Sequence, residues 1–160
     1  MKRLKRDLAL APLSILAGLL IFGVSKQCSG QIITYEQTQD LKYTVTVKNG
    51  TSFTQYIPKD GKTLIIGQSV SLGKPLKGKI FRTVAHEKLK ASEIMFGTFD
   101  YASKLSNDDQ MIIEDIIVVH DKMDSASPLN IVLIIKKKDK NNFKTVISVE
   151  KAISYGEIVI

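Results

Sequence analysis

The sequence predicts a mainly β fold for residues 31–160, a small antiparallel barrel or a two-sheet sandwich, after an N-terminal hydrophobic segment. Three observations lead to this class. Apolar residues beyond position 30 are mostly Ile and Val, in short runs with period-two alternation. Gly, Asn and Asp interrupt these runs about every ten residues. No stretch beyond residue 30 carries the long apolar stripe of an amphipathic helix.

Residues 1–30 have the pattern of a secretory signal peptide. Lys2, Arg3, Lys5 and Arg6 precede an uncharged run of 17 residues from Leu8 to Val24, and a short polar stretch with small residues follows. Cleavage after residue 30 makes residues 31–160 a single mature domain.

Two other interpretations of this segment stay open. A spanning helix needs about 20 residues, so residues 8–25 would form a membrane anchor if they were retained. Cys28 is the third possibility, as a lipid-modified residue. All three interpretations place residues 31–160 outside the cytoplasm, because Lys and Arg stay on the cytoplasmic side. The domain is then periplasmic, at the cell surface, secreted, or anchored in the inner membrane with its N-terminus cytoplasmic.

The charge balance changes once this segment is set apart. The whole chain has 23 Lys+Arg and 16 Asp+Glu, a net charge of +7 that suggests a nucleic-acid partner at first sight. Residues 1–30 hold +4 of it, which leaves +3 on residues 31–160. We therefore expect no nucleic-acid partner. One Cys and two His exclude a disulfide framework within the chain and a zinc site built from Cys and His.

In the first half of the domain, the spacing predicts a hairpin around Asn49–Thr51. Tyr43, Val45 and Val47 alternate with Thr residues, and Pro58 ends the second strand. The predicted strands of this half are Tyr43–Val47, Phe53–Ile57, Leu64–Ile66, Val70–Leu72 and Lys79–Val84.

In the second half, Ala85–Met95 has a helix-like composition, yet Leu89 alone makes a poor apolar stripe, so one short helix is an open expectation. Tyr101–Gln110 is polar and predicts a loop. An antiparallel meander of three strands follows, then one helical turn capped by Gly156 and a last short strand. These elements are Ile112–Asp121, Ile131–Lys138, Phe143–Val149, Glu150–Tyr155 and Glu157–Ile160.

No arrangement typical of catalysis is present. His86 and His120 are the only histidines, and the nucleophile motif G-x-S-x-G is absent. Strict alternation would place His120 on the strand face of Ile112 and Ile116. The sequence also lacks a calcium-loop pattern and a phosphate-binding glycine loop. We therefore predict a domain that is not an enzyme, with no cofactor, no metal ligands and no catalytic residues.

The densest basic run of the domain lies at a predicted hairpin tip. Lys136, Lys137, Lys138 and Lys140, with Phe143 just beyond, form a candidate contact for an anion, a polysaccharide, a lipid headgroup or a partner protein. The alternative is a charged hairpin end that discourages edge-to-edge pairing of strands.

Two segments resemble those of short exported bacterial β-rich proteins of unassigned function. The first is Gly61–Pro75, with a G-x-x-h-x-h-G-K-P unit in which h is hydrophobic, and the second is Glu150–Ile158, with an E-x-A-I-x-x-G-E-I ending. The resemblance covers roughly residues 60–160, apart from a long polar insertion around Ala85–Gln110. It implies an exported β-rich domain and no known catalytic residues.

The function expected from these observations is that of a non-catalytic domain of the cell envelope that binds a protein or a glycan. One alternative is a membrane-anchored subunit of an envelope assembly, which needs residues 8–25 retained as a helix. The other alternative is a small hydrolase that uses His86 or His120.

Overall fold

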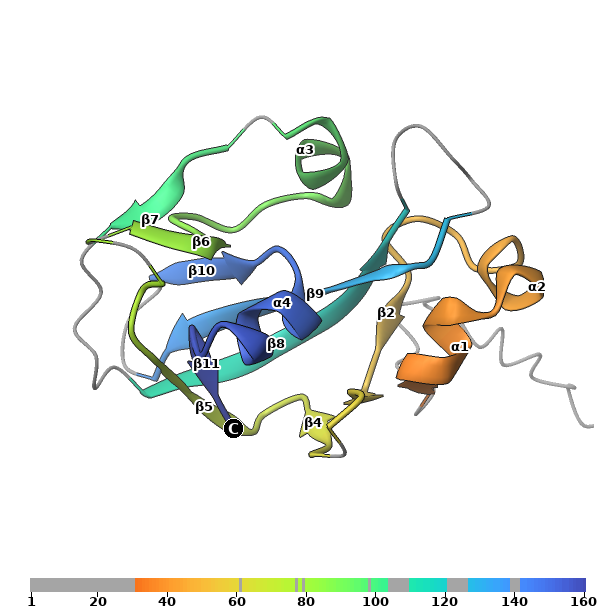
Figure 1. Ribbon diagram of the computed structural model, residues 1–160, viewed down its shortest axis with the longest axis horizontal. Helices are drawn as coiled ribbons and strands as arrows, with labels where there is room; N and C mark the ends of the chain where they lie inside the picture. Colours follow the sequence, from red (N-terminus) through yellow and green to blue (C-terminus); the bar gives the residue numbers. More distant parts are fainter. Residues whose placement is uncertain are drawn as a thin grey trace, which may run out of the picture.

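One strongly curled antiparallel sheet dominates the computed structural model, which describes residues 31–60, 62–76, 78, 80–97, 99–103, 110–120, 127–138 and 142–160 (Figure 1). Strands hold 42% of these residues and helices 19%, so the predicted mainly β class is confirmed. Residues 8–25, Cys28 and Lys140 lie outside the described residues. In the described ranges, no helix combines the length and the apolar character that crossing a membrane requires.

The curled sheet has eight strands and forms a half-barrel. Its order is β11-β5-β8-β9-β10-β6-β7, and β2 pairs with β8 beside this path. The strands are β2 (Ser52–Phe53), β5 (Ser69–Leu72), β6 (Ile80–Ala85), β7 (Tyr101–Ser103), β8 (Gln110–Val119), β9 (Asn130–Lys137), β10 (Phe143–Val146) and β11 (Ile158–Val159). The predicted meander of three strands is β8-β9-β10 and is confirmed.

A second sheet of three strands is formed by the first part of the domain. Strand β3 (Gln55–Ile57) lies in the middle, parallel to β1 (Ile32–Thr34) and antiparallel to β4 (Leu64–Ile65). The start of the domain is held to this sheet, because the Thr54 backbone N–H donates to the Gln31 carbonyl at 3.1 Å. The small sheet therefore ties the first described residues to the body of the domain.

The predicted hairpin over residues 43–57 is wrong. Residues Leu41–Thr44 form helix α2, capped by the Asp40 carboxylate, which accepts from the Lys42 N–H at 2.9 Å. Val45, which the alternation would bury, is 66% exposed. The Asp40 cap thus favours a helical turn over the period-two strand, and Tyr43 and Val47 still pack against the main core. The turn at Gly50 does form, but it leads into β2 through the Gly50 N–H, which donates to the Val118 carbonyl at 2.8 Å.

Strand β8 contains a bulge that decides which side chains enter the core. The register with β9 shifts between Ile113 and Asp115, so Glu114 is the additional residue. Ile113 and Ile116 therefore both belong to the main core, whereas strict alternation would place them on opposite faces. The prediction that Ile112 shares a face with Ile116 is wrong for the same reason.

The opposite face of β8 and β9 is covered by helix α3 (Ala91–Phe96). Ala91, Ile94 and Met95 pack there against Ile117, Val119 and Val132. The helix expected over residues 85–95 thus forms only in its last part. Two backbone groups of residues 86–90 are bonded to β10 instead, since Thr145 Oγ1 donates to the Glu87 carbonyl at 2.7 Å and accepts from the Leu89 N–H at 2.9 Å.

Helix α4 (Val149–Ser154) packs on the face of the sheet that holds the main core, through the buried side chains of Val149 and Ala152. It confirms the predicted helical turn, and Gly156 takes a left-handed conformation with φ +67° just beyond it. Helix α1 (Tyr35–Gln39) carries a capping box between Thr34 and Gln37. The segment expected to be a loop over residues 101–110 contributes β7 and the first residue of β8.

The chain closes on itself around the buried Glu157 carboxylate. Oε1 accepts from the Leu76 and Arg82 N–H groups at 3.3 and 2.8 Å, and Oε2 accepts from the Thr83 N–H and hydroxyl at 2.8 and 2.6 Å. Beside it, the Gly73 N–H donates to the Glu157 carbonyl at 2.9 Å, and β5 pairs with β11. The two segments that carry the resemblance therefore lie against each other, and their contacts stabilise the closure of the sheet.

We expect Gly73→Ala to destabilise the fold by about 3 kcal/mol or more, because an ideal Cβ at this position lies 1.8 Å from the Gly156 carbonyl oxygen. Gly67→Ala is the control, with a positive φ of +87° and open space around the added Cβ. Its cost should stay near 1–2 kcal/mol, from backbone strain alone. Chemical denaturation of both variants compares these costs, and equal losses would refute the close approach of the two glycines.

We expect Glu157→Gln to lower the free energy of unfolding by about 1–3 kcal/mol, because the amide NH₂ would face backbone N–H groups that now have an acceptor. Glu114→Gln is the matched control. Its carboxylate forms a partly exposed ion pair with Lys136 at 2.7 Å, so the loss should stay below about 1 kcal/mol. Urea titration at neutral pH measures both, and a loss for Glu157→Gln as small as that of the control would contradict the role of this carboxylate.

Candidate ligand cleft

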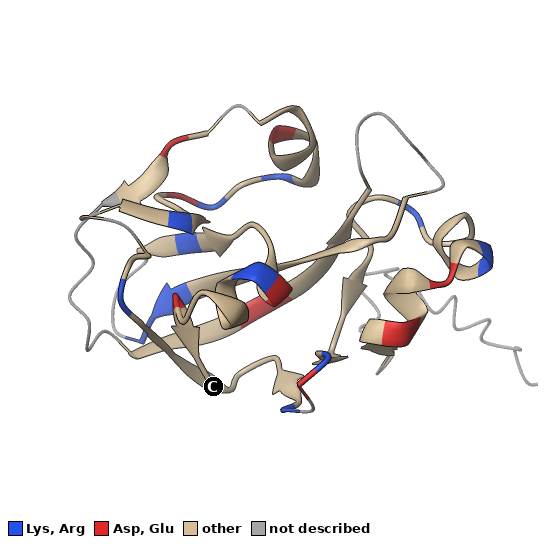
Figure 2. Cartoon of the chain, viewed as in Figure 1, with Lys and Arg blue, Asp and Glu red and all other residues tan. Residues whose placement is uncertain are grey.

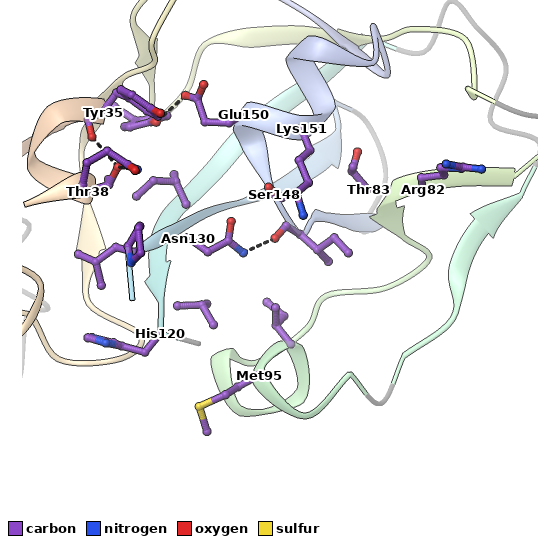
Figure 3. A pocket seen from close by; sticks show the side chains of 18 of the residues that line it. Tyr35, Thr38, Arg82, Thr83, Met95, His120, Asn130, Ser148, Glu150 and Lys151 are labelled. Atoms are coloured by element: carbon purple, nitrogen blue, oxygen red, sulfur yellow. Dashed lines mark hydrogen bonds between the residues drawn. The ribbon is translucent and has the colours of Figure 1, made fainter. Parts of the chain in front are cut away.

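A cleft of about 640 Å³ opens where β8 ends and β9 begins. Helices α1, α3 and α4 and strands β6 and β7 surround it (Figure 3). Its walls therefore come from segments that are far apart in the sequence, from Tyr35 to Lys151.

At one end, α1 and β3 meet α4. The Tyr56 hydroxyl donates to Glu150 Oε1 at 2.6 Å, and the Lys59 N–H donates to the same oxygen at 3.3 Å. Burial of Tyr56 raises the pKa of the phenol far above its usual value, and the hydrogen bond to Glu150 is the second largest cause of this shift. The phenol therefore stays protonated and joins the small sheet to α4.

In the middle of the cleft, Asn130 holds the start of β9 to the chain after β10. Its Nδ2 donates to the Ile147 carbonyl at 2.6 Å, as Figure 3 shows. On the side of α1, the Leu129 N–H donates to the Thr38 carbonyl at 2.9 Å. These two hydrogen bonds fix the position of the backbone that forms the floor of the cleft.

At the other end, aromatic rings line the cleft beside basic side chains. The Phe99 and Tyr101 rings meet edge to face, with centroids 5.4 Å apart, and Tyr101 is 45% exposed. Arg82 and Lys151 are exposed side chains of β6 and α4. In Figure 3 the Lys151 side chain extends from α4 toward the middle of the cleft.

A second hollow of about 480 Å³ adjoins this end. It shares Arg82, Thr83, Tyr101 and Lys151 with the cleft and adds Tyr155 to the wall. These four shared residues therefore form a border, with the cleft on one side and the second hollow on the other.

The histidines have structural partners. His120 lies at the border of the cleft, where Nε2 donates to the Val47 carbonyl at 2.7 Å and the backbone N–H donates to Asn49 Oδ1 at 3.1 Å. His86 Nδ1 lies 3.1 Å from Lys144 Nζ, which also donates to the His86 carbonyl at 2.7 Å. Burial lowers the pKa of Lys144. Among the described residues, no group of three or more His, Cys, Asp and Glu side chains is placed to hold a metal ion.

The predicted basic cluster lies at the other end of β9, and none of its described members lines the cleft. Lys136 and Phe143 are opposite each other on β9 and β10. The Lys136 ammonium pairs with Glu114, and Lys88 Nζ lies 5.0 Å from the centre of the Phe143 ring. Lys137 and Lys138 follow on β9 and just after it. A partner contact at this cluster stays a prediction.

Of the residues that line the cleft, the sequence singled out only His120. The lining residues are separated along the chain, and no motif joins them. Tyr101 gave one usable signal, an aromatic residue in an otherwise polar segment.

Comparison of the chain with protein-family models, with curated proteins and with solved structures finds no match in any of the three.

We expect Tyr56→Phe to cost about 1.5–3 kcal/mol near neutral pH, because the phenol donates to a carboxylate. An unfolded-state phenol ionises near pH 10, while the folded one keeps its proton, so its contribution is complete below pH 10 and is lost as the pH rises beyond it. The difference between wild type and variant should therefore narrow by about 1.4 kcal/mol between pH 9 and 11.

Urea denaturation at several pH values in this range measures the narrowing. Tyr155→Phe, at an exposed tyrosine of the adjoining hollow, is the control and should leave stability within about 0.5 kcal/mol of wild type. A pH-independent difference for Tyr56→Phe would refute the protonated phenol.

Proposed function

We propose that residues 31–160 form a non-catalytic, exported domain of the cell envelope that binds a glycan in the cleft. The observation that carries the proposal is the combination of partly exposed aromatic rings with polar and charged side chains in one concave site. Sugar rings present apolar C–H faces and hydroxyl edges, and they need both kinds of partner at once. The signal-peptide pattern of residues 1–30 supports export.

The size of the cleft supports a small or chain-like ligand. About 640 Å³ lies within the range of 300–1,000 Å³ that is usual for ligand sites. A partner protein needs a wider surface, of about 800 Å² on each side. The cleft is therefore better suited to bind a few sugar units than to bind the surface of a partner protein.

Binding without hydrolysis is supported by the acidic groups. Glycoside hydrolysis ordinarily uses two carboxyl groups on either side of the scissile bond. Among the described residues that line the cleft, Glu150 is the only acidic one, and it accepts from Tyr56 and Lys59. His120 commits Nε2 to the Val47 carbonyl. We therefore favour a binding domain over the small hydrolase.

An array of bacterial and plant oligosaccharides, followed by calorimetry on the probes that bind, tests the proposal. Tyr101→Ala should weaken binding about tenfold, which corresponds to about 1.4 kcal/mol, because the ring offers an exposed stacking face. Phe96→Ala is the matched control, since Phe96 is an exposed aromatic residue that does not line the cleft. Binding to no probe, or equal loss in both variants, would reject glycan binding in the cleft.

A further inference from the structure

Arg82 and Lys151 are shared by the cleft and by the adjoining hollow, so any ligand that passes from one to the other meets both cations. Both residues are exposed. Within the part of the chain that the structure describes, neither cation forms an ion pair with a carboxylate, in contrast to Lys136, which pairs with Glu114. Two unpaired cations on the border of a concave site favour a negatively charged ligand.

Two acidic side chains of the surrounding elements, Glu157 and Glu150, are already engaged. Glu157 is fully buried and accepts four hydrogen bonds from Leu76, Arg82 and Thr83. Glu150 is bonded to Tyr56 and the Lys59 backbone. The basic positions of β6 and α4 lie on the half of the molecule that holds the curled sheet (Figure 2). Neither the Glu157 nor the Glu150 carboxylate neutralises Arg82 or Lys151, so both cations can interact with a bound anion.

The arrangement of the two cations distinguishes a chain from a single anion. In Figure 3 the Lys151 side chain reaches toward the cleft, whereas Arg82 lies apart from it, on the other side of Thr83. Tyr101 and Tyr155, which are 45% and 38% exposed, line the adjoining hollow with Arg82. A ligand with charges on successive units, separated by faces that can stack on a ring, fits this order of groups.

We propose that the ligand is an acidic oligosaccharide, with carboxylate or sulfate groups on successive sugar units, which runs from the cleft across Thr83 into the adjoining hollow. This inference rests on the proposed function and names the class of glycan that the site selects. Lys151 and Arg82 each bind one anionic group, and Tyr101, which lines both hollows, offers a stacking face to the sugar chain.

Calorimetry with the full domain tests the charge selection. The probes are oligogalacturonates, alginate oligomers and chondroitin sulfate oligomers, each beside its uncharged counterpart, a methyl ester or a desulfated methyl ester. We expect at least one acid form to bind about tenfold more tightly than its uncharged counterpart, and its affinity to fall as salt rises. Arg82→Gln and Lys151→Gln should each weaken the acid form about threefold, so that the double variant loses the tenfold preference and binds both forms equally.

Lys42→Gln, at an exposed lysine of α2 that lines neither hollow, is the control and should bind like wild type. Equal binding of acid and uncharged forms by wild type would overturn the charge inference and leave glycan binding intact. Binding to no sugar probe would overturn both proposals. Binding to phosphatidylglycerol vesicles alone, lost in the double variant, would also overturn them and assign the two cations to a membrane surface.

Discussion

The buried carboxylate of Glu157 is the interaction on which the arrangement of the domain depends. It accepts hydrogen bonds from the backbone before β6 and from β6 itself, while its own backbone bonds to Gly73 at the end of β5. Strands β5 and β6 are distant in the order of the sheet, since β8, β9 and β10 lie between them. One residue thus joins two separated parts of the curled sheet through charge-assisted hydrogen bonds.

The cleft is a consequence of this closure. Curling brings β6 and α4 to the same end of the molecule as the start of β9, and the Tyr56–Glu150 bond then attaches the small sheet to α4. The cleft walls formed by the small sheet and α4 are therefore held together by hydrogen bonds within the protein. A site built in this way is largely formed before a ligand arrives, which reduces the entropy that binding must overcome.

The sequence predicted the mainly β class and the meander of the last third well, because long Ile- and Val-rich runs such as Ile131–Ile135 have no other way to be buried. It failed at residues 43–47, where Asp40 caps a short helix, so that Tyr43 and Val47 reach the core without a strand while Val45 is exposed. The bulge at Glu114 was equally out of reach, since it follows from the pairing with β9 and not from local composition. The cleft could not be predicted, because its residues meet only once the sheet is curled.

The anchoring of Gln31 to the small sheet has a consequence for the topology of the whole chain. Because the Gln31 carbonyl accepts a hydrogen bond from Thr54, the folded domain begins at residue 31, directly after the hydrophobic stretch and the short polar segment that follows it. Five residues, 26–30, separate an anchor over residues 8–25 from Gln31, and at about 3.3–3.6 Å each they reach no further than about 18 Å. If residues 8–25 remained in a bilayer, the tether would be so short that the small sheet would face the headgroups closely. The domain would then sample a thin layer above the membrane, with little freedom to reach ligands farther out.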